Sequence, residues 1–408
     1  MEYISRRLER KFIRMSEFFK AVLVTGARQV GKTTMLRHLA EGQNRTYVTL
    51  DNLTARDLAK SDPILFFQTY KPPIIIDEVQ YAPELFSQIK VICDNSEETG
   101  LFWLTGSQQY SMMKNVRESL AGRIGILELY SLSKNEKAGL SFDNELDFSL
   151  SCLQERQKEA PRNDIVDVFE HIWRGGMPQV LLADAEQRSE YYHAYVNTYL
   201  MRDITEIGNV TDSLRFGKFL TACASLVSEQ LNYKKLSEAS DISQPTAKEW
   251  LRLLESLGII YLLQPYANNA LKRLTRTLKL YFCDTGLAAH LSMWLTPETL
   301  INGAASGHFF ENFVVMELVM NYAYSRTKAN LTYFRDSNSK EIDVIIEENN
   351  MVHALEIKKS ANPDKRGIKK FTLLDKASVA RGAGGILCMC EEVIPIDEMN
   401  YMIPCNLL

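Results

Sequence analysis

Residues 21–34 read Ala-Val-Leu-Val-Thr-Gly-Ala-Arg-Gln-Val-Gly-Lys-Thr-Thr, an apolar run that breaks into a glycine-rich turn. The spacing Gly-x-x-x-x-Gly-Lys-Thr predicts a buried strand, a loop whose N–H groups cradle phosphate, and a helix whose N-terminus attracts negative charge. We therefore predict that the chain binds a nucleoside triphosphate with Mg²⁺. Lys32 is expected at the β- and γ-phosphates, and the Thr33 hydroxyl is expected on Mg²⁺. The residues predicted to bind the nucleotide are Gly26, Ala27, Arg28, Gln29, Val30, Gly31, Lys32, Thr33 and Thr34.

Two further apolar runs predict the rest of a hydrolytic site. Residues 74–76 are three isoleucines followed by Asp77 and Glu78, which is typical of a central parallel strand that ends in acids. Asp77 would hold Mg²⁺ through water, and Glu78 would orient or deprotonate the attacking water. The run at residues 101–107 ends in small polar residues, among them Thr105 and Ser107, at the strand end where ligands of such sheets bind. One of these two hydroxyls is expected at the γ-phosphate or the water, unless they only end the strand.

The composition limits the class of protein and its surroundings. The chain has 408 residues, of which 46% are hydrophobic and 24% charged, and this length predicts two to four domains. The net charge of −4 excludes a global basic field, so any contact with nucleic acid must come from a local patch. Seven scattered cysteines predict reduced thiols. A charged N-terminal segment without a signal peptide and the lack of a long apolar run predict a cytoplasmic protein without membrane contact.

Five short stretches together resemble the prokaryotic AAA-type ATPases that carry a C-terminal DUF4143 domain. They are Thr-Gly-Ala-Arg-Gln-Val-Gly-Lys-Thr-Thr from Thr25, Ile-Ile-Ile-Asp-Glu-Val-Gln to Gln80, Leu-Thr-Gly-Ser to Ser107, and Leu-Ala-Gly-Arg to Arg123 with Tyr-Ser-Leu-Ser from Tyr130. The resemblance implies ATP rather than GTP as the nucleotide, which no residue demonstrates by itself. It also implies that Arg123 is an arginine finger, acting in trans on a neighbouring subunit of a homo-oligomer. The alternative for Arg123 is an ion pair within the fold.

Residues 233–266 predict a helix, a turn, a second helix and an apolar strand, which is the order of a winged helix. In DNA-binding versions of this fold the start of the second helix enters the major groove, which makes Gln244, Thr246 and Lys248 candidate contacts. Lys272 and Arg273 belong to a basic segment that follows and would contact phosphates. Residues 231–281 hold eight Lys/Arg and four Asp/Glu, a local excess of positive charge. The alternative is a module that contacts protein or a second copy of the chain.

The last quarter carries acids in a pattern that resembles the restriction-endonuclease-like PD-(D/E)xK fold. Asp343 opens one apolar strand, Glu356 and Lys358 share a face of the next by the period of two, and Glu311 begins a helix upstream. The resemblance implies that Asp343 and Glu356 bind Mg²⁺ or Mn²⁺ with the Ile357 carbonyl, that Lys358 stabilises hydroxide, and that Glu311 completes the site through water. The Pro-Asp of the motif is absent, and Glu-Ile-Asp stands there instead. The alternative is an inactive domain that only binds.

We therefore predict an α/β chain of four domains. These are a P-loop AAA-type ATPase domain at 1–140 with a parallel sheet, a helical lid or connector at 141–230, a winged-helix-like domain at 231–300, and a nuclease-like DUF4143 domain at 301–408. The expected activity is ATP hydrolysis coupled to DNA binding or remodelling, with metal-dependent cleavage as an added activity. The competing predictions are a nucleotide-switched oligomeric scaffold that binds without cutting, and a nuclease effector gated by the ATPase. DNA and second copies are the expected partners, and a protein partner is a further option.

Overall fold

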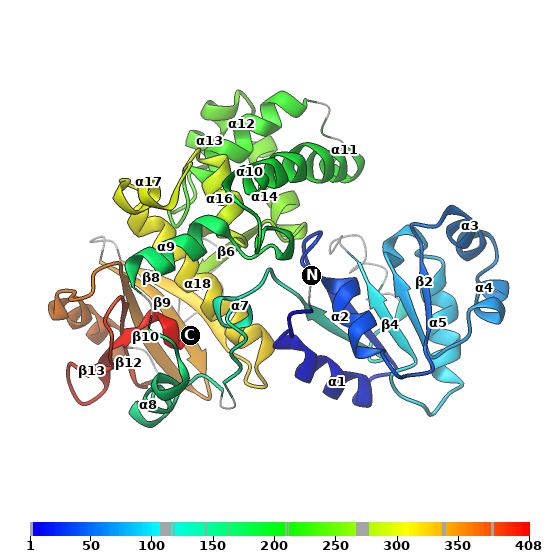
Figure 1. Cartoon of the computed structure of the whole chain (residues 1–408), viewed down its shortest axis with the longest axis horizontal. Coiled ribbons are helices and arrows are strands. Elements are labelled where there is room, and N and C mark those ends of the chain that lie inside the picture. Colours follow the sequence, from blue (N-terminus) through cyan, green and yellow to red (C-terminus); the bar gives the residue numbers. More distant parts are fainter. Residues whose placement is uncertain are drawn as a thin grey trace. The chain divides into compact units, whose positions relative to one another are not determined.

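The computed structural model describes residues 3–106, 116, 119–142, 145–162, 164–208, 210, 212–266, 277–336, 340–376 and 379–408. The chain divides into two compact units. The first consists of Met1–Leu132 with the short segment Ser256–Gly258, and the second of Ser133–Glu255 with Ile259–Leu408 (Figure 1).

The first unit is built on a five-stranded parallel sheet with the order β2-β3-β4-β1-β5. The strands are β1 (Ala21–Thr25), β2 (Thr46–Thr49), β3 (Ile74–Asp77), β4 (Phe102–Thr105) and β5 (Ile124–Glu128). Every residue of β1, β3 and β4 is buried, as expected of the middle strands of a parallel sheet that is covered on both faces. The predicted strands at the P-loop and at the acidic pair are therefore the centre of this sheet.

The helices of the first unit follow the strands in the alternating order of βαβ units. They are α1 (Leu8–Phe18), α2 (Lys32–Leu39), α3 (Leu53–Ser61), α4 (Pro63–Thr69), the 3₁₀ turn η1 (Val79–Tyr81) and α5 (Leu85–Asp94). Apolar residues of α3, α4 and α5 pack against β1, β3 and β4 in one core that includes Phe66, Phe86 and Ile89. This packing fixes the carboxyl ends of the strands, where the P-loop begins.

The second unit is helical in its first half. Its helices are α7 (Lys134–Lys137), α8 (Leu150–Glu159), α9 (Ile165–Arg174), η2 (Pro178–Val180), α10 (Ala185–Ala194), the π-helix η3 (Tyr195–Leu200), α11 (Met201–Gly208), α12 (Ser213–Ala224), α13 (Tyr233–Ser240), α14 (Gln244–Ser256), α16 (Thr285–Leu291), α17 (Pro297–Asn302) and α18 (Ser306–Tyr324). Figure 1 shows helices α10 to α14 grouped together, apart from strands β8 to β12. The helix, turn and helix expected after residue 233 are present as α13 and α14.

One mixed sheet organises the rest of the second unit, with the main order β13-β14-β12-β10-β9-β8-β6-β7. The strands are β6 (Ile260–Pro265), β7 (Lys279–Phe282), β8 (Asn330–Arg335), β9 (Glu341–Glu348), β10 (Met351–Lys358), β11 (Ala380–Arg381), β12 (Gly384–Cys388), β13 (Ile394–Pro395) and β14 (Asn400–Pro404), followed by η5 (Cys405–Leu407); η4 (Lys365–Lys376) lies between β10 and β11. The antiparallel pair β6–β7 joins the later strands because β6 pairs with β8. The predicted boundary at residue 300 thus falls between strands of one sheet.

The fold class is the predicted one: an α/β chain with a parallel nucleotide-type sheet, a helical middle region and a mixed C-terminal sheet. Within the part of the chain that the structure describes, no helix has the length and apolar character that crossing a membrane requires.

Candidate functional site

The P-loop connects β1 to α2 through backbone conformations that require glycine. Gly26 has φ 139° and Gly31 has φ 98°, both in the region that side chains rarely adopt. A Cβ at Gly26 would also collide with the carbonyl oxygen of Leu129, in the segment after β5. The loop can therefore keep this tight turn only with glycine at its first position.

Lys32 is the first residue of α2, and its side chain turns back over the loop. Only 6% of the residue is exposed. Its ammonium donates hydrogen bonds to the carbonyl oxygens of Gly26 at 3.0 Å and Ala27 at 2.7 Å. The charge that is expected to bind the β- and γ-phosphates therefore lies inside the loop. Of the other predicted nucleotide contacts, Val30 is buried and Thr34 is exposed.

Asp77 ends β3 and gathers polar side chains from three neighbouring elements. Its Oδ1 accepts hydrogen bonds from the hydroxyls of Thr33 and Thr105, both at 2.5 Å. Its Oδ2 accepts one from the Tyr47 hydroxyl at 3.3 Å. Burial and the charge of Asp77 together raise the pKa of Tyr47 to about 12. The predicted Mg²⁺ pair, Thr33 and Asp77, is thus in direct contact, and these hard oxygen donors fit Mg²⁺.

Glu78 adopts a left-handed conformation with φ 56°, and two neighbours hold it there. Its backbone N–H donates to the Thr105 hydroxyl at 3.1 Å, and its carboxylate accepts a hydrogen bond from the side-chain amide of Gln80. Of the two hydroxyls predicted at this strand end, Thr105 therefore contacts both acids of the pair. Ser107 lies outside the described residues.

Arg6 is a site residue that the sequence analysis missed. Its guanidinium donates to the carbonyl oxygen of Val30 in the P-loop at 2.7 Å and to that of Tyr130 at 2.8 Å, and the residue is only 4% exposed. It ties the loop to the segment after β5. Arg6 belongs to a basic N-terminal run of the kind that usually faces solvent. No feature of the sequence around Arg6 indicated that it would be buried against the P-loop.

Arg123 lies at the amino-terminal end of the strands, whereas the P-loop lies at their carboxyl-terminal end. The pairing of Ala21 with Ile124 and of Thr25 with Glu128 places it beside the start of β1, whereas the loop follows the end of β1. It forms a bidentate ion pair with Asp94, at 2.5 Å and 3.1 Å. The ion pair that was the alternative for Arg123 is therefore present, and only a second copy of the chain could use this arginine as a finger.

The candidate DNA contacts lie at the start of α14. Ser243 accepts a hydrogen bond from the N–H of Thr246 at 3.2 Å and so caps this helix. Gln244 and Lys248 are exposed, while Thr246 is half-buried with its hydroxyl 2.7 Å from that of Ser243. Lys272 and Arg273 lie outside the described residues.

Three of the four predicted nuclease residues meet on β9 and β10. Asp343 Oδ2 accepts a hydrogen bond from the N–H of Ile357 at 2.8 Å and lies 4.0 Å from the ammonium of Lys358. Lys358 also pairs with Glu356 at 2.6 Å. The other oxygen of Glu356 is paired with Lys370 of η4 at 2.5 Å. Register and period thus place these side chains on one face, as predicted.

Glu311 of α18 forms hydrogen bonds with two residues of β7, and the sequence did not predict these contacts. It accepts hydrogen bonds from the ammonium of Lys279 at 2.6 Å and from the hydroxyl of Tyr281 at 2.8 Å. Lys279 also pairs with Glu341 at 2.8 Å.

The acids of the predicted metal site, Glu311, Asp343 and Glu356, thus have cations of the protein itself beside them. Across the residues that the structure describes, no three His, Cys, Asp or Glu side chains are placed to hold a metal ion together. The physical reason is that lysine ammonium groups pair with Glu311 and Glu356. The residues present therefore do not fit a nuclease metal ion in this arrangement.

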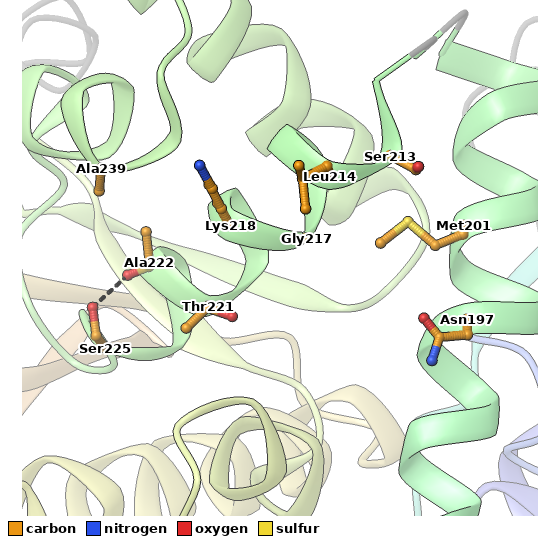
Figure 2. A pocket seen from close by; sticks show the side chains of 10 residues that line it. All are labelled: Asn197, Met201, Ser213, Leu214, Gly217, Lys218, Thr221, Ala222, Ser225 and Ala239. Atoms are coloured by element: carbon orange, nitrogen blue, oxygen red, sulfur yellow. Dashed lines mark hydrogen bonds between the residues drawn. The ribbon is translucent and has the colours of Figure 1, made fainter.

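A pocket of about 900 Å³ lies along α12 of the second unit and shares no lining residue with the sites described above. Its lining comes from α12 and the following residue Ser225, together with Asn197 of η3, Met201 of α11 and Ala239 of α13. Figure 2 shows the Met201 side chain reaching toward α12, which presents Leu214, Gly217 and Thr221. None of the residues predicted from sequence as functional lines this pocket.

Comparison with known families matches three segments of the chain. Residues 18–138 match an AAA domain, residues 165–298 match a domain of unknown function, DUF8612, and residues 306–408 match DUF4143, also of unknown function. Uncharacterized proteins of Mycobacterium tuberculosis and Mycobacterium bovis are each 27% identical over 388 residues, which cover 94% of this chain and 80% of theirs.

Solved structures that match this chain do so with low sequence identity and TM-scores below 0.5. A Walker-type ATPase of Pyrococcus abyssi is 16% identical with a TM-score of 0.45, over 71% of this chain and 96% of its own. The RuvB Holliday junction branch migration motor of Thermotoga maritima is 16% identical with a TM-score of 0.32, over 63% of this chain and 89% of its own. Likeness at this level carries no argument about function. The chain combines an AAA domain, whose P-loop site supports ATP binding and hydrolysis, with a C-terminal DUF4143 domain.

Proposed function

We propose that the chain hydrolyses ATP to ADP and phosphate at the P-loop, in a reaction that depends on Mg²⁺ held by Thr33 and Asp77. The observation that carries the proposal is the hydrogen-bond chain from Thr33 through Asp77 to Thr105, next to Glu78. It places a hydroxyl, a buried carboxylate and a second acid at adjoining strand ends. When bound there, Mg²⁺ would neutralise charge on the phosphates.

The chain's own residues have separate tasks in this reaction. Lys32 exchanges the carbonyl oxygens of Gly26 and Ala27 for phosphate oxygens and stabilises their negative charge. Glu78 orients the attacking water. Thr105 holds the backbone N–H of Glu78, and Gln80 holds the carboxylate of Glu78. Positioning of this kind is most of what phosphoryl transfer requires from a protein.

A phosphate-release assay on the Lys32→Ala variant tests the proposal. Turnover should fall by about a hundredfold or more, because the loop loses its phosphate-binding cation. Lys60→Ala, which removes an exposed lysine of α3 in the same unit, is the matched control and should keep the wild-type rate. Equal rates for wild type and Lys32→Ala, with and without DNA, would refute the hydrolase proposal.

We further propose that DNA is the partner whose binding the ATPase serves. Three observations support this. The exposed side chains of Gln244 and Lys248 lie at the start of α14, the sequence around them has an excess of positive charge, and an antiparallel strand pair follows the helix. The order α12, a bridge at Gln230, α13, α14 and the pair β6–β7 is the order of a winged helix. In that fold the start of α14 would enter the major groove.

A salt titration of duplex binding, followed by fluorescence anisotropy, tests the role of α14. Lys248→Glu should weaken binding and reduce the slope of log affinity against log salt by about one or more, because a phosphate contact is lost. Lys158→Glu makes the same charge change on the exposed side of α8 and should leave both quantities unchanged. Identical curves for wild type and Lys248→Glu would contradict this assignment, and the absence of DNA binding in the wild type would remove the DNA role altogether.

A nucleotide-switched oligomeric scaffold is the second candidate function. It is favoured by the position of Arg123, which only another copy of the chain could use, and by the lysines that pair with the C-terminal acids. Mass photometry with ADP and with a non-hydrolysable ATP analogue distinguishes the two proposals when combined with the phosphate assay. The scaffold requires assembly with the analogue and negligible turnover, whereas the hydrolase requires turnover that Lys32→Ala removes.

A further inference from the structure

We propose that Lys279 takes the place of a divalent cation among the C-terminal acids, so that this cluster is an internally neutralised ion network rather than a metal-dependent nuclease centre. This inference is independent of the ATPase proposal, because it concerns only residues of the second unit.

The surroundings of Lys279 are those of a permanently bound ammonium ion. The residue is 2% exposed, and its Nζ lies 2.6 Å from Glu311 and 2.8 Å from Glu341. The rings of Tyr281 and Tyr333 also lie near it, with centroids 5.9 Å and 5.7 Å from Nζ. Aromatic faces attract an ammonium group, whereas Mg²⁺ and Mn²⁺ require oxygen ligands or water on every side.

The charges of the network balance without a metal. The acids are Glu311, Glu341, Asp343 and Glu356, and the bases that contact them are Lys279, Arg335, Lys358 and Lys370. A divalent cation binds to carboxylates whose negative charge is not already compensated. In this network an added divalent cation would instead meet ammonium groups at short range, which disfavours its binding.

Lys279 stays charged in this setting. Burial alone would lower its pKa, but the carboxylates of Glu311 and Glu341 outweigh burial and hold the pKa above its ordinary value. Burial raises the pKa of Glu311, and the ammonium of Lys279 acts in the opposite direction.

The backbone around Lys279 fixes it in place. Lys279 is the first residue of β7, whose strand pairs with β6 and which packs against α18. The side chain of Asn312, one residue after Glu311, makes two hydrogen bonds to the backbone of Phe282, at 2.7 Å and 2.9 Å. These bonds hold the far end of β7 to the same helix, so the backbone that carries Lys279 stays beside the helix that carries Glu311.

Mn²⁺ titration of the nucleotide-free full chain, followed by electron paramagnetic resonance, tests the proposal. Wild type and Glu311→Gln should bind Mn²⁺ equally weakly at the C-terminal site. Lys279→Met keeps the aliphatic stem but removes the charge, and it should gain a site with about tenfold or more tighter Mn²⁺ binding. Adding Glu311→Gln to Lys279→Met should abolish the gain. Lys359→Met is the matched control, because Lys359 bonds to the Ile301 carbonyl and the Ser306 hydroxyl and to none of the acids.

Two results would overturn the proposal. One is a Mn²⁺ site in the wild type that both Glu311→Gln and Asp343→Asn remove, because the acids would then bind metal with Lys279 present. The other is a Lys279→Met variant that melts as a folded protein and binds Mn²⁺ no more tightly than Lys359→Met. The first comparison does not need Lys279→Met, so the proposal can be tested even where that variant fails to fold. Cutting of duplex or single-stranded DNA by the wild type with Mn²⁺, lost in Lys358→Ala, would also refute it.

Discussion

The most informative perturbation of the nucleotide site is Arg6→Ala, because Arg6 joins the P-loop to a distant segment without being part of the motif. Its guanidinium donates to the Val30 and Tyr130 carbonyls at 2.7 Å and 2.8 Å in a buried setting. The peptide unit that carries the Val30 carbonyl also carries the N–H of Gly31. Loss of Arg6 should therefore loosen the part of the loop that is expected to face phosphate.

The cost follows from the bonds that are lost. Hydrogen bonds to charged groups contribute about 1.5–3 kcal/mol each, so two of them set an upper range of about 3–6 kcal/mol. Water that enters the space left by the side chain restores part of the bonding to both carbonyls. We therefore expect Arg6→Ala to lower the stability of the first unit by about 3 kcal/mol and to weaken ATP binding by about tenfold.

Native-state hydrogen exchange of the peptide that spans residues 21–34, with ATP affinity measured in parallel, provides the assay. Protection of this peptide should fall in Arg6→Ala and only partly recover in Arg6→Lys, because a single ammonium cannot match the fork of the guanidinium. Arg14→Ala, on the exposed side of α1, is the control and should change neither quantity. Unchanged exchange and unchanged ATP affinity in Arg6→Ala would refute the view that this arginine supports the loop.

Three further predictions concern other parts of the two units. Thr105→Val should lower kcat by about tenfold or more with little change in KM, because Glu78 loses the hydroxyl that holds its N–H; Thr105→Ser should restore the rate, and an unchanged kcat in the valine variant would contradict this role. Burial, with help from nearby Lys137, lowers the pKa of His171 to about 3, so the folded state binds fewer protons than the unfolded state below the ordinary pKa of 6.5. Stability should therefore be lost as pH falls below that value, by about 1–2 kcal/mol near pH 5, and urea unfolding of His171→Gln should lack this part of the loss. Arg123→Ala should hardly alter thermal stability, because its pair with Asp94 is exposed, so a large loss of turnover in this variant would identify a finger and an unchanged rate would exclude one.

The parts of the nucleotide site that lie close together in sequence were predictable. The P-loop is one continuous segment, and its glycines are required by positive φ angles that the residue type itself indicates. Asp77 was predicted because a short run of isoleucines that ends in acids is typical of a central parallel strand. Thr105 was an expected contact, but its double role toward Asp77 and the N–H of Glu78 depends on strand register, which a single sequence does not contain.

The C-terminal cluster shows which contacts a sequence motif cannot predict. Asp343, Glu356 and Lys358 were placed together correctly because they lie on two adjacent strands joined by a short turn. Lys279 could not be predicted, since 62 residues separate it from Glu341 and it lies in a segment assigned to another domain. It reaches the acids only because β6 pairs with β8 and extends one sheet across the expected boundary.

The contact of Lys279 with the motif acids matters for how acid-x-Lys patterns are interpreted. A motif names the carboxylates that could hold a metal, whereas metal binding depends on the total charge that the fold brings to them. In this chain the deciding cation comes from β7, outside the motif, and a hydrogen bond from the backbone of Phe282 to Asn312 holds that strand to the helix that carries Glu311. A search for cleavage activity should therefore begin with the Lys279→Met variant rather than with the wild type, because only the variant leaves Glu311 and Glu341 without their ammonium partner.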